Sequence, residues 1–169
     1  MLWDLVNFQK IKRALLYALY MSLVLLVQDA LFSNISIFGV RAMFVPAAAV
    51  AVGMFEGGVW GAVFSLALGF LTDISFGNTA LFVALFPCIG FAAGALSRYL
   101  VNRRFFAYMC LALLALALTA AFQFLGLALE GQSLPALAWV GLWQVVFSLP
   151  VAALLYFPCK AIASPHKKG

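Results

Sequence analysis

Long apolar runs alternate with short polar segments along this chain, and their lengths predict helices that cross a membrane. A transmembrane helix needs about 20 mostly apolar residues to cross a hydrocarbon core of about 30 Å. The runs that we assign as spans are residues 14–32, 42–55, 58–72, 79–97, 105–129 and 135–157. The second contains Pro46 and is too short to cross comfortably unless it begins nearer Ile35 or is partly irregular. We therefore expect an all-α polytopic membrane protein, built as a six-transmembrane-helix bundle.

Small residues recur at every fourth position in the middle of the chain. They are Gly53, Gly57, Gly61, Ser65 and Gly69, and the next step reaches Asp73. Residues four apart share one face of a helix, so the spacing predicts a ridge without bulky side chains. In lipid, such a ridge lets another helix approach closely. Two uses stay open: the ridge packs the protein against itself, or part of it receives a transmembrane helix of a partner, which makes the five small residues candidates for that interface.

Polar and basic residues flank the predicted bundle at both ends of the chain. Residues 1–13 mix apolar and polar side chains and are expected to form an interfacial segment on the inner membrane surface. The basic cluster before the first run also suits a cleaved signal peptide, but that run is longer than a signal core and no small-residue cleavage site follows it. We expect one membrane domain over residues 14–158, followed by a basic cytoplasmic tail over residues 159–169.

Composition and charge support the membrane assignment and set the expected orientation. The chain is 67% hydrophobic and 9% charged, far from the quarter charged that is typical of soluble domains. Its net charge of +5 does not indicate nucleic-acid binding, because the cations lie at the ends of apolar runs. Six spans place nearly all of them on one side, which predicts that both termini are cytoplasmic. These cations are Lys10, Lys12, Arg13, Arg98, Arg103, Arg104, Lys160, Lys167 and Lys168.

Four charged residues are expected near the outer ends of the spans. Asp29, Asp73 and Glu130 lie near the outward ends of the first, third and fifth spans, and Arg41 is the one cation on that side. A carboxylate at the C-terminal end of a helix is disfavoured by the helix dipole, so each acid needs solvent, a hydrogen bond or a cation. We expect Arg41 to pair with Asp73 or Asp29, with a functional contact as the alternative.

The sequence offers no set of residues that would carry catalysis. His166 is the only histidine and lies in the basic tail, so neither a histidine metal site nor histidine-based nucleophile activation is expected within the spans. Glu56 precedes two glycines but lacks the Gly-Lys-Ser/Thr element of a phosphate-binding loop. Cys88, Cys110 and Cys159 lie in apolar surroundings without paired spacing and are interpreted as packing residues. We expect a protein without enzymatic activity and without a cofactor.

The order of motifs resembles the bacterial rod shape-determining protein MreD family over most of the chain. The first span ends in Val-Gln-Asp-Ala-Leu-Phe (residues 27–32), Gly-Gly-Val-Trp-Gly (57–61) opens the third, Leu-Gly-Phe-Leu-Thr-Asp (68–73) closes it, and Gly-Phe-Ala-Ala-Gly (90–94) lies in the fourth. The matching positions are Gln28, Gly61, Gly69, Asp73 and Gly94. Two departures are that Pro46 lies inside the second span rather than opening it, and that the segment after the third span is short.

This resemblance implies a non-catalytic scaffold in the bacterial inner membrane. Proteins of this family associate with MreC and, through the elongation complex, with MreB, a class B penicillin-binding protein and its partner glycosyltransferase. The resemblance thus implies support of cell shape and lateral peptidoglycan synthesis through contacts between transmembrane helices. A homodimer is an equally simple product of a self-associating ridge.

A second class of protein stays open as the alternative. The substrate-binding S-component of an energy-coupling-factor (ECF) vitamin transporter also has six spans in a chain of this length, and MreD-type proteins resemble it in fold. Ala14 and Ala18 have the spacing that such subunits use in their first span to dock on the coupling partner. Against it, the predicted outer loops are brief and provide few polar groups to hold a vitamin.

Overall fold

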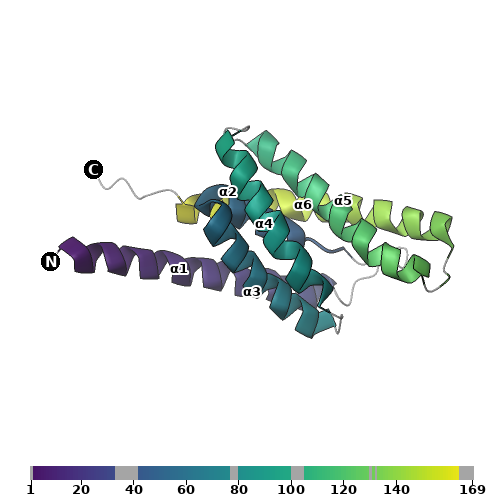
Figure 1. Ribbon diagram of the computed structural model, residues 1–169, viewed down its shortest axis with the longest axis horizontal. Coiled ribbons are helices and arrows are strands. Elements are labelled where there is room, and N and C mark those ends of the chain that lie inside the picture. The colour runs from purple at the N-terminus through teal and green to yellow at the C-terminus, as the bar shows by residue number, and fades with distance from the viewer. Residues whose placement is uncertain are drawn as a thin grey trace.

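The computed structural model describes residues 2–32, 42–76, 80–99, 105–129, 131 and 133–163. Every regular element in these ranges is helical, which confirms the all-α prediction, and the helices pack into one bundle (Figure 1). The elements are α1 (Leu2–Val27), a π-helical turn η1 (Gln28–Phe32), α2 (Val45–Glu56), α3 (Gly58–Phe76), α4 (Leu81–Tyr99), α5 (Phe105–Leu129) and α6 (Leu134–Ala163).

Within the described ranges, four of the six helices are long and apolar enough to cross a membrane. Their apolar spans are Ile11–Ala30, Gly58–Ser75, Phe105–Leu125 and Leu134–Ala163. Two further apolar helices are shorter, namely Val45–Glu56 and Leu81–Ser97. Because an α-helix rises 1.5 Å per residue, the 12 residues of α2 extend only about 18 Å, well under the thickness of a hydrocarbon core. The chain is therefore a polytopic membrane protein whose apolar helices contact lipid.

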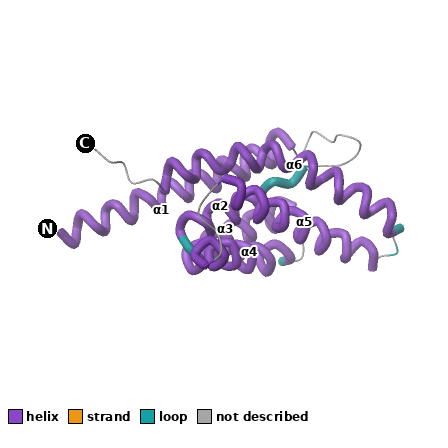
Figure 2. The backbone as a smooth tube through the Cα atoms, turned by 90° about the horizontal axis from the view of Figure 1, so that it is seen from above, coloured by secondary structure: helices purple, strands orange, loops and turns teal. Residues whose placement is uncertain are grey.

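The short helix α2 lies at the centre of the bundle (Figure 2). Eleven of its 12 residues are buried, and most of them are alanine or valine. Small side chains on every face let the surrounding helices approach α2 closely from several directions. Pro46 falls in the first turn, where its missing N–H removes no helical hydrogen bond. The second predicted span is thus a half-length buried helix.

A glycine turn joins α2 to α3. Gly57 has a φ of 92°, a left-handed conformation that other residues adopt only with strain, and its N–H donates to the carbonyl of Gly53 at 2.9 Å. The chain reverses here within one residue. As a result, the first turns of α3 run beside the last turns of α2.

The helices at both ends of the chain continue across the predicted domain boundaries. α1 continues without a break from Leu2 to Val27, and no glycine or proline occurs in residues 2–13 to interrupt it, so the expected interfacial segment belongs to the same helix as the first span. α6 continues through Pro158 to Ala163 and buries Cys159 completely, so the first residues of the expected basic tail are helical. In a packed bundle, neighbouring helices allow a proline inside a membrane helix.

Candidate functional site

The predicted small-residue ridge packs inside the bundle. A Cβ added at Gly61 would lie 2.5 Å from the Cα of Gly53 and 2.9 Å from the carbonyl oxygen of Gly90. A Cβ added at Gly53 would itself meet the Gly90 backbone. The backbones of α2, α3 and α4 therefore meet at these three glycines without side chains between them.

The rest of the ridge is covered in the same way. A Cβ at Gly69 would lie 2.8 Å from the carbonyl carbon of Phe82 in α4, and Ser65 fills the space beside Gly90. On α4, a Cβ at Gly94 would lie 2.5 Å from the carbonyl carbon of Gly57.

The interpretation of Gly53, Gly57, Gly61, Ser65 and Gly69 as a partner-helix interface is therefore wrong. All five are buried against the protein's own helices, and they do not share one helix, because the chain turns at Gly57 between α2 and α3. Of the two uses that the spacing allowed, internal packing is the one observed. The physical reason is that the turn folds the first part of the ridge back onto the second, and α4 covers both.

Gln28 fastens the non-helical segment before α2. Its amide Nε2 donates to the carbonyl of Ala42 at 2.7 Å, and its Oε1 accepts from the N–H of Phe44 at 3.1 Å. The side chain is only 2% exposed. Backbone groups at membrane depth must be satisfied within the protein, and Gln28 does this for two groups at once. This matching position of the resemblance therefore has a defined structural role.

Three further polar side chains from α5 and α6 complete the support of this segment. The Ser148 hydroxyl accepts from the N–H of Met43 at 2.9 Å and donates to the carbonyl of Gln144 at 2.7 Å. The Gln144 side chain donates to Oε1 of Gln123 at 3.2 Å, and Gln123 donates to the Met43 sulfur at 3.4 Å. We call Gln28, Gln123, Gln144 and Ser148 the polar clamp. Nothing in the sequence singled out Gln123, Gln144 or Ser148, because isolated polar residues within apolar runs form no recognisable motif.

Asp73 caps the N-terminus of α4. One carboxylate oxygen accepts from the N–H of Phe82 at 3.2 Å, and the other accepts from the N–H of Val83 at 2.8 Å. The side chain is buried. A carboxylate at this position satisfies two amides that have no partner within the helix and complements the positive end of the helix dipole. The cost of placing Asp73 at the C-terminal end of α3 is thus offset by α4.

The other members of the predicted outer charge cluster are only partly placed. Asp29 is half-buried in η1. Arg41 and Glu130 lie outside the described residues, so the expected pairing of Arg41 with Asp73 or Asp29 stays a prediction. Both oxygens of Asp73 already accept hydrogen bonds from the backbone of α4.

An ion pair that the sequence analysis missed lies at the other end of the bundle. Nε of Arg13 is 3.0 Å from the Glu56 carboxylate, and its Nη2 donates to the carbonyl of Ala163 at 2.6 Å. Arg13 thus joins the first part of α1, the last residue of α2 and the last residue of α6. One feature of the sequence was available to predict this pair. Glu56 lies at the end of the second predicted span, and the six-span topology places that end on the same side of the membrane as the basic residues.

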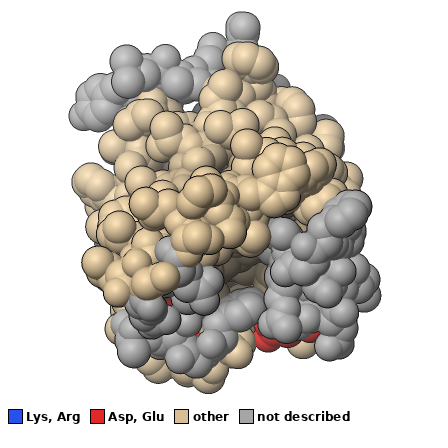
Figure 3. Space-filling view, turned by 90° about the vertical axis from the view of Figure 1, so that its right-hand side faces the viewer, with Lys and Arg blue, Asp and Glu red and all other residues tan. Residues whose placement is uncertain are grey.

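The two ends of the bundle differ in charge. The beginning of α1 and the end of α6 lie at the same end (Figure 1). They bring Lys12, Arg13 and Lys160 there together. The opposite end shows no lysine or arginine among the described atoms in view, and a few acidic atoms are visible (Figure 3). The expected gathering of cations on one side of the membrane stays a prediction, because most of the other lysine and arginine side chains lie outside the described residues.

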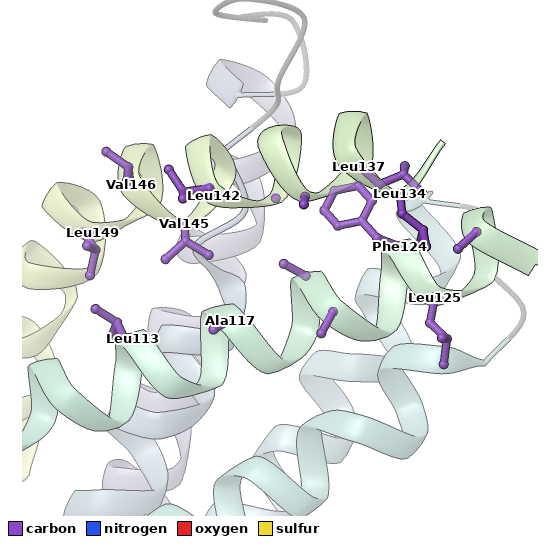
Figure 4. Close-up of a pocket in the computed structure, with 15 residues that line it drawn as sticks. Leu113, Ala117, Phe124, Leu125, Leu134, Leu137, Leu142, Val145, Val146 and Leu149 are labelled. Atoms are coloured by element: carbon purple, nitrogen blue, oxygen red, sulfur yellow. The ribbon is translucent and has the colours of Figure 1, made fainter. Parts of the chain in front are cut away.

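An apolar groove lies between α5 and α6. It has a volume of about 570 Å³. It extends toward the C-terminal end of α5, at residue 129, and the N-terminal end of α6, at residue 134. Phe124 and Leu137 lie between the helices (Figure 4). Small residues from both helices, Ala117, Ala121, Ala138 and Gly141, also line it. All 15 lining residues are apolar, so the groove suits hydrocarbon or an apolar helix rather than a polar substrate.

The described residues contain no cluster of three or more histidine, cysteine or acidic side chains that could hold a metal ion. Cys159 is buried, whereas Cys88 and Cys110 are exposed on helix surfaces. No family model, no curated protein and no solved structure matches the chain.

Proposed function

We propose that this protein is a non-catalytic scaffold of the bacterial cytoplasmic membrane that acts by binding transmembrane helices of partner proteins. The resemblance to MreD implies the rod elongation complex as the assembly and an MreC-like protein as the direct partner. MreB, a class B penicillin-binding protein and its glycosyltransferase partner would join through the complex. In this proposal both termini are cytoplasmic, which is the side where lysine and arginine accumulate.

The observation that carries the proposal is how the protein uses its polar groups. Within the described residues, five of the six buried polar side chains have hydrogen-bond partners inside the protein: Gln28, Thr72, Asp73, Thr119 and Ser148. The sixth, Ser65, has no hydrogen-bond partner among the described residues and fills the space beside Gly90 between α3 and α4, and the buried hydroxyl of Tyr17 is the other hydroxyl without one. A site for a polar substrate needs polar groups directed into a cavity. No polar side chain among the described residues lines the groove between α5 and α6, which favours recognition of an apolar partner.

We assign the partner's helix to the α5–α6 groove. Helices associate in lipid through close packing rather than through a hydrophobic drive, and small residues allow that approach. Ala121 and Ala138 are exposed within the groove, so larger side chains there would fill it without entering the core. The glycine ridge is not available for this contact, because α4 covers it.

Filling the groove tests the proposal. The double variant Ala121→Leu/Ala138→Leu should lose co-purification with the MreC-like protein while keeping its own thermal stability in detergent. Ala92→Leu provides the matched control, because Ala92 is exposed on α4, outside the groove. Co-purification that survives in the groove variant, or that fails equally in the control, would rule out the groove as the contact surface.

The alternative function is supported by one observation. Ala14 and Ala18, the pair that suggested an S-component, are both exposed on α1 and free to contact another helix. For an ECF-type subunit, Ala18→Leu should abolish assembly with a coupling protein. Riboflavin, thiamine or biotin should also raise the thermal midpoint, since a ligand that binds only the folded state stabilises it. Stabilisation by a vitamin would replace the scaffold proposal by the transporter.

A further inference from the structure

Helix α1 contacts the bundle along one stripe and faces outward with the rest of its surface. The buried residues of the stripe recur every three or four positions: Tyr17, Tyr20, Met21, Val24, Leu25 and Gln28. Leu15, Leu19, Leu23 and Leu26 are exposed on the other faces. Because lipid is as apolar as leucine, separating α1 from the bundle in a membrane carries little hydrophobic cost. Polar contacts therefore contribute much of what fixes the position of α1.

Those polar contacts differ between the two ends of the stripe. Near η1, Gln28 is 2% exposed and makes two hydrogen bonds with the backbone of residues 42–44. At the basic end, Arg13 is held by Glu56 and by the carbonyl of Ala163, and its side chain is 44% exposed. Water and ions therefore reach the Arg13 contact, whereas the Gln28 contact is enclosed. Between them, the Tyr20 hydroxyl donates to the carbonyl of Leu155 at 3.2 Å.

Two buried groups lie directly behind the Arg13 contact. Tyr17 is 1% exposed and its hydroxyl has no hydrogen-bond partner among the described residues. The hydroxyl lies beside the Glu56 carboxylate and the Cys159 thiol, and the thiol is completely buried. If the first half of α1 moved away from α6, water would reach both the Tyr17 hydroxyl and the Cys159 thiol.

We propose that α1 is a hinged arm that pivots at the enclosed Gln28 contact and is latched at the basic end by the Arg13–Glu56 pair and the Ala163 carbonyl. Gln28 is the first residue of η1, and π-helical turns are frequently found at functional sites. Opening releases Arg13, separates the first half of α1 from α6, and uncovers Tyr17 and Cys159 from the basic side. This inference does not depend on the proposed scaffold function, because it concerns only the contacts of α1.

The experiment measures the reactivity of Cys159 with a water-soluble maleimide. Cys88→Ser and Cys110→Ser remove the two exposed thiols and leave Cys159 as the single reporter. In the full chain in lipid nanodiscs, Glu56→Gln and Arg13→Gln should each increase the labelling rate about twofold, as expected when a partly exposed ion pair is lost. Asp73→Asn is the matched control, since it converts an acid to its amide at the opposite end, and it should leave the rate unchanged.

A second readout separates hinged opening from general unfolding. Spin labels at Ala30→Cys and Leu142→Cys, both exposed positions near the pivot end, should keep the same distance distribution when Glu56 is replaced by Gln in a background lacking the native cysteines. Labels at Lys12→Cys and Phe157→Cys, at the latch end, should move apart. Three results would each overturn the hinged-arm proposal. They are unchanged Cys159 labelling in both latch variants, equally fast labelling in the Asp73→Asn variant, and a broader distance distribution for the spin-label pair at the pivot end.

Discussion

The contact between α3 and α4 and the contact between α1 and the bundle are built from different interactions. Along α3 and α4, Gly61, Ser65, Gly69 and Gly90 bring two backbones together, and no hydrogen bond between side chains is needed. Along α1 the neighbours are kept apart by tyrosines and aliphatic side chains, and polar groups join the helix to α2 and α6. The comparison shows two ways to hold helices in lipid. The α3–α4 contact depends on closely fitting backbones with no free space between them. The α1 contact depends on a few polar interactions that can be broken.

The largest effect is expected where the backbones touch. Gly61→Ala places a methyl group against the Cα of Gly53 and the carbonyl of Gly90, and neither can turn aside. We expect the free energy of unfolding to fall by about 3 kcal/mol, at the upper end for overpacked sites. Denaturation by sodium dodecyl sulfate, followed by tryptophan fluorescence, measures it. Gly141→Ala is the control, because its Cβ would meet only the Phe124 ring at 3.0 Å, which can rotate. Equal stability of the two variants would contradict the packing argument.

A smaller loss is expected when the polar clamp is opened. Gln28→Leu leaves the carbonyl of Ala42 and the N–H of Phe44 buried without their partner. Each unsatisfied buried group costs about 1 kcal/mol or more, so the same denaturation assay should show a loss of about 2 kcal/mol. Ser22→Ala should change stability by less than about 0.5 kcal/mol, since the Ser22 hydroxyl is exposed and bonds only within its own helix. A Gln28 variant as stable as the Ser22 variant would show that the clamp is dispensable.

The cap on α4 should contribute less than the clamp. Asp73→Ala removes both acceptors from the first turn of α4, and loss of an N-terminal cap costs about 1 kcal/mol. Asp73→Asn keeps one acceptor and should lose less. Hydrogen exchange at the amides of Phe82 and Val83 reports the change directly and should accelerate most in the alanine variant. Unaltered exchange at both amides would mean that other groups cap the helix.

The latch should have the smallest effect on global stability. Glu56→Gln removes an ion pair whose cation is 44% exposed, so unfolding should become easier by only about 0.5 kcal/mol. The difference from the parent should shrink at 1 M salt, because salt screens exposed charges. A loss as large as that of Gly61→Ala would mean that α1 is fixed as rigidly as α4, and the contrast between the two regions would disappear.

Sequence reasoning located the helices but could not assign their partners. The fifth predicted span, Phe105–Leu129, coincides with α5, and the third and fourth agree with α3 and α4 within a few residues. Over residues 42–55, the shortest predicted span, the structure forms the regular 12-residue helix α2, which is too short to cross a hydrocarbon core. The predicted ridge also consists of residues that pack closely. Its assignment to a partner was wrong, because the spacing of small residues describes one face of a helix and not the helix that covers it.

The sequence by itself determined that this chain is an all-α membrane protein, because the length and apolarity of each run set whether a helix can cross lipid. It also predicted that most lysine and arginine residues lie on one side of the membrane, because they fall at the ends of the apolar runs. Tertiary structure alone decided that α4 covers the glycines, that Gln28 supports residues 42–44, and that Arg13 meets Glu56 and Ala163. These contacts join residues far apart in the chain, and their geometry depends on how whole helices pack rather than on any local pattern.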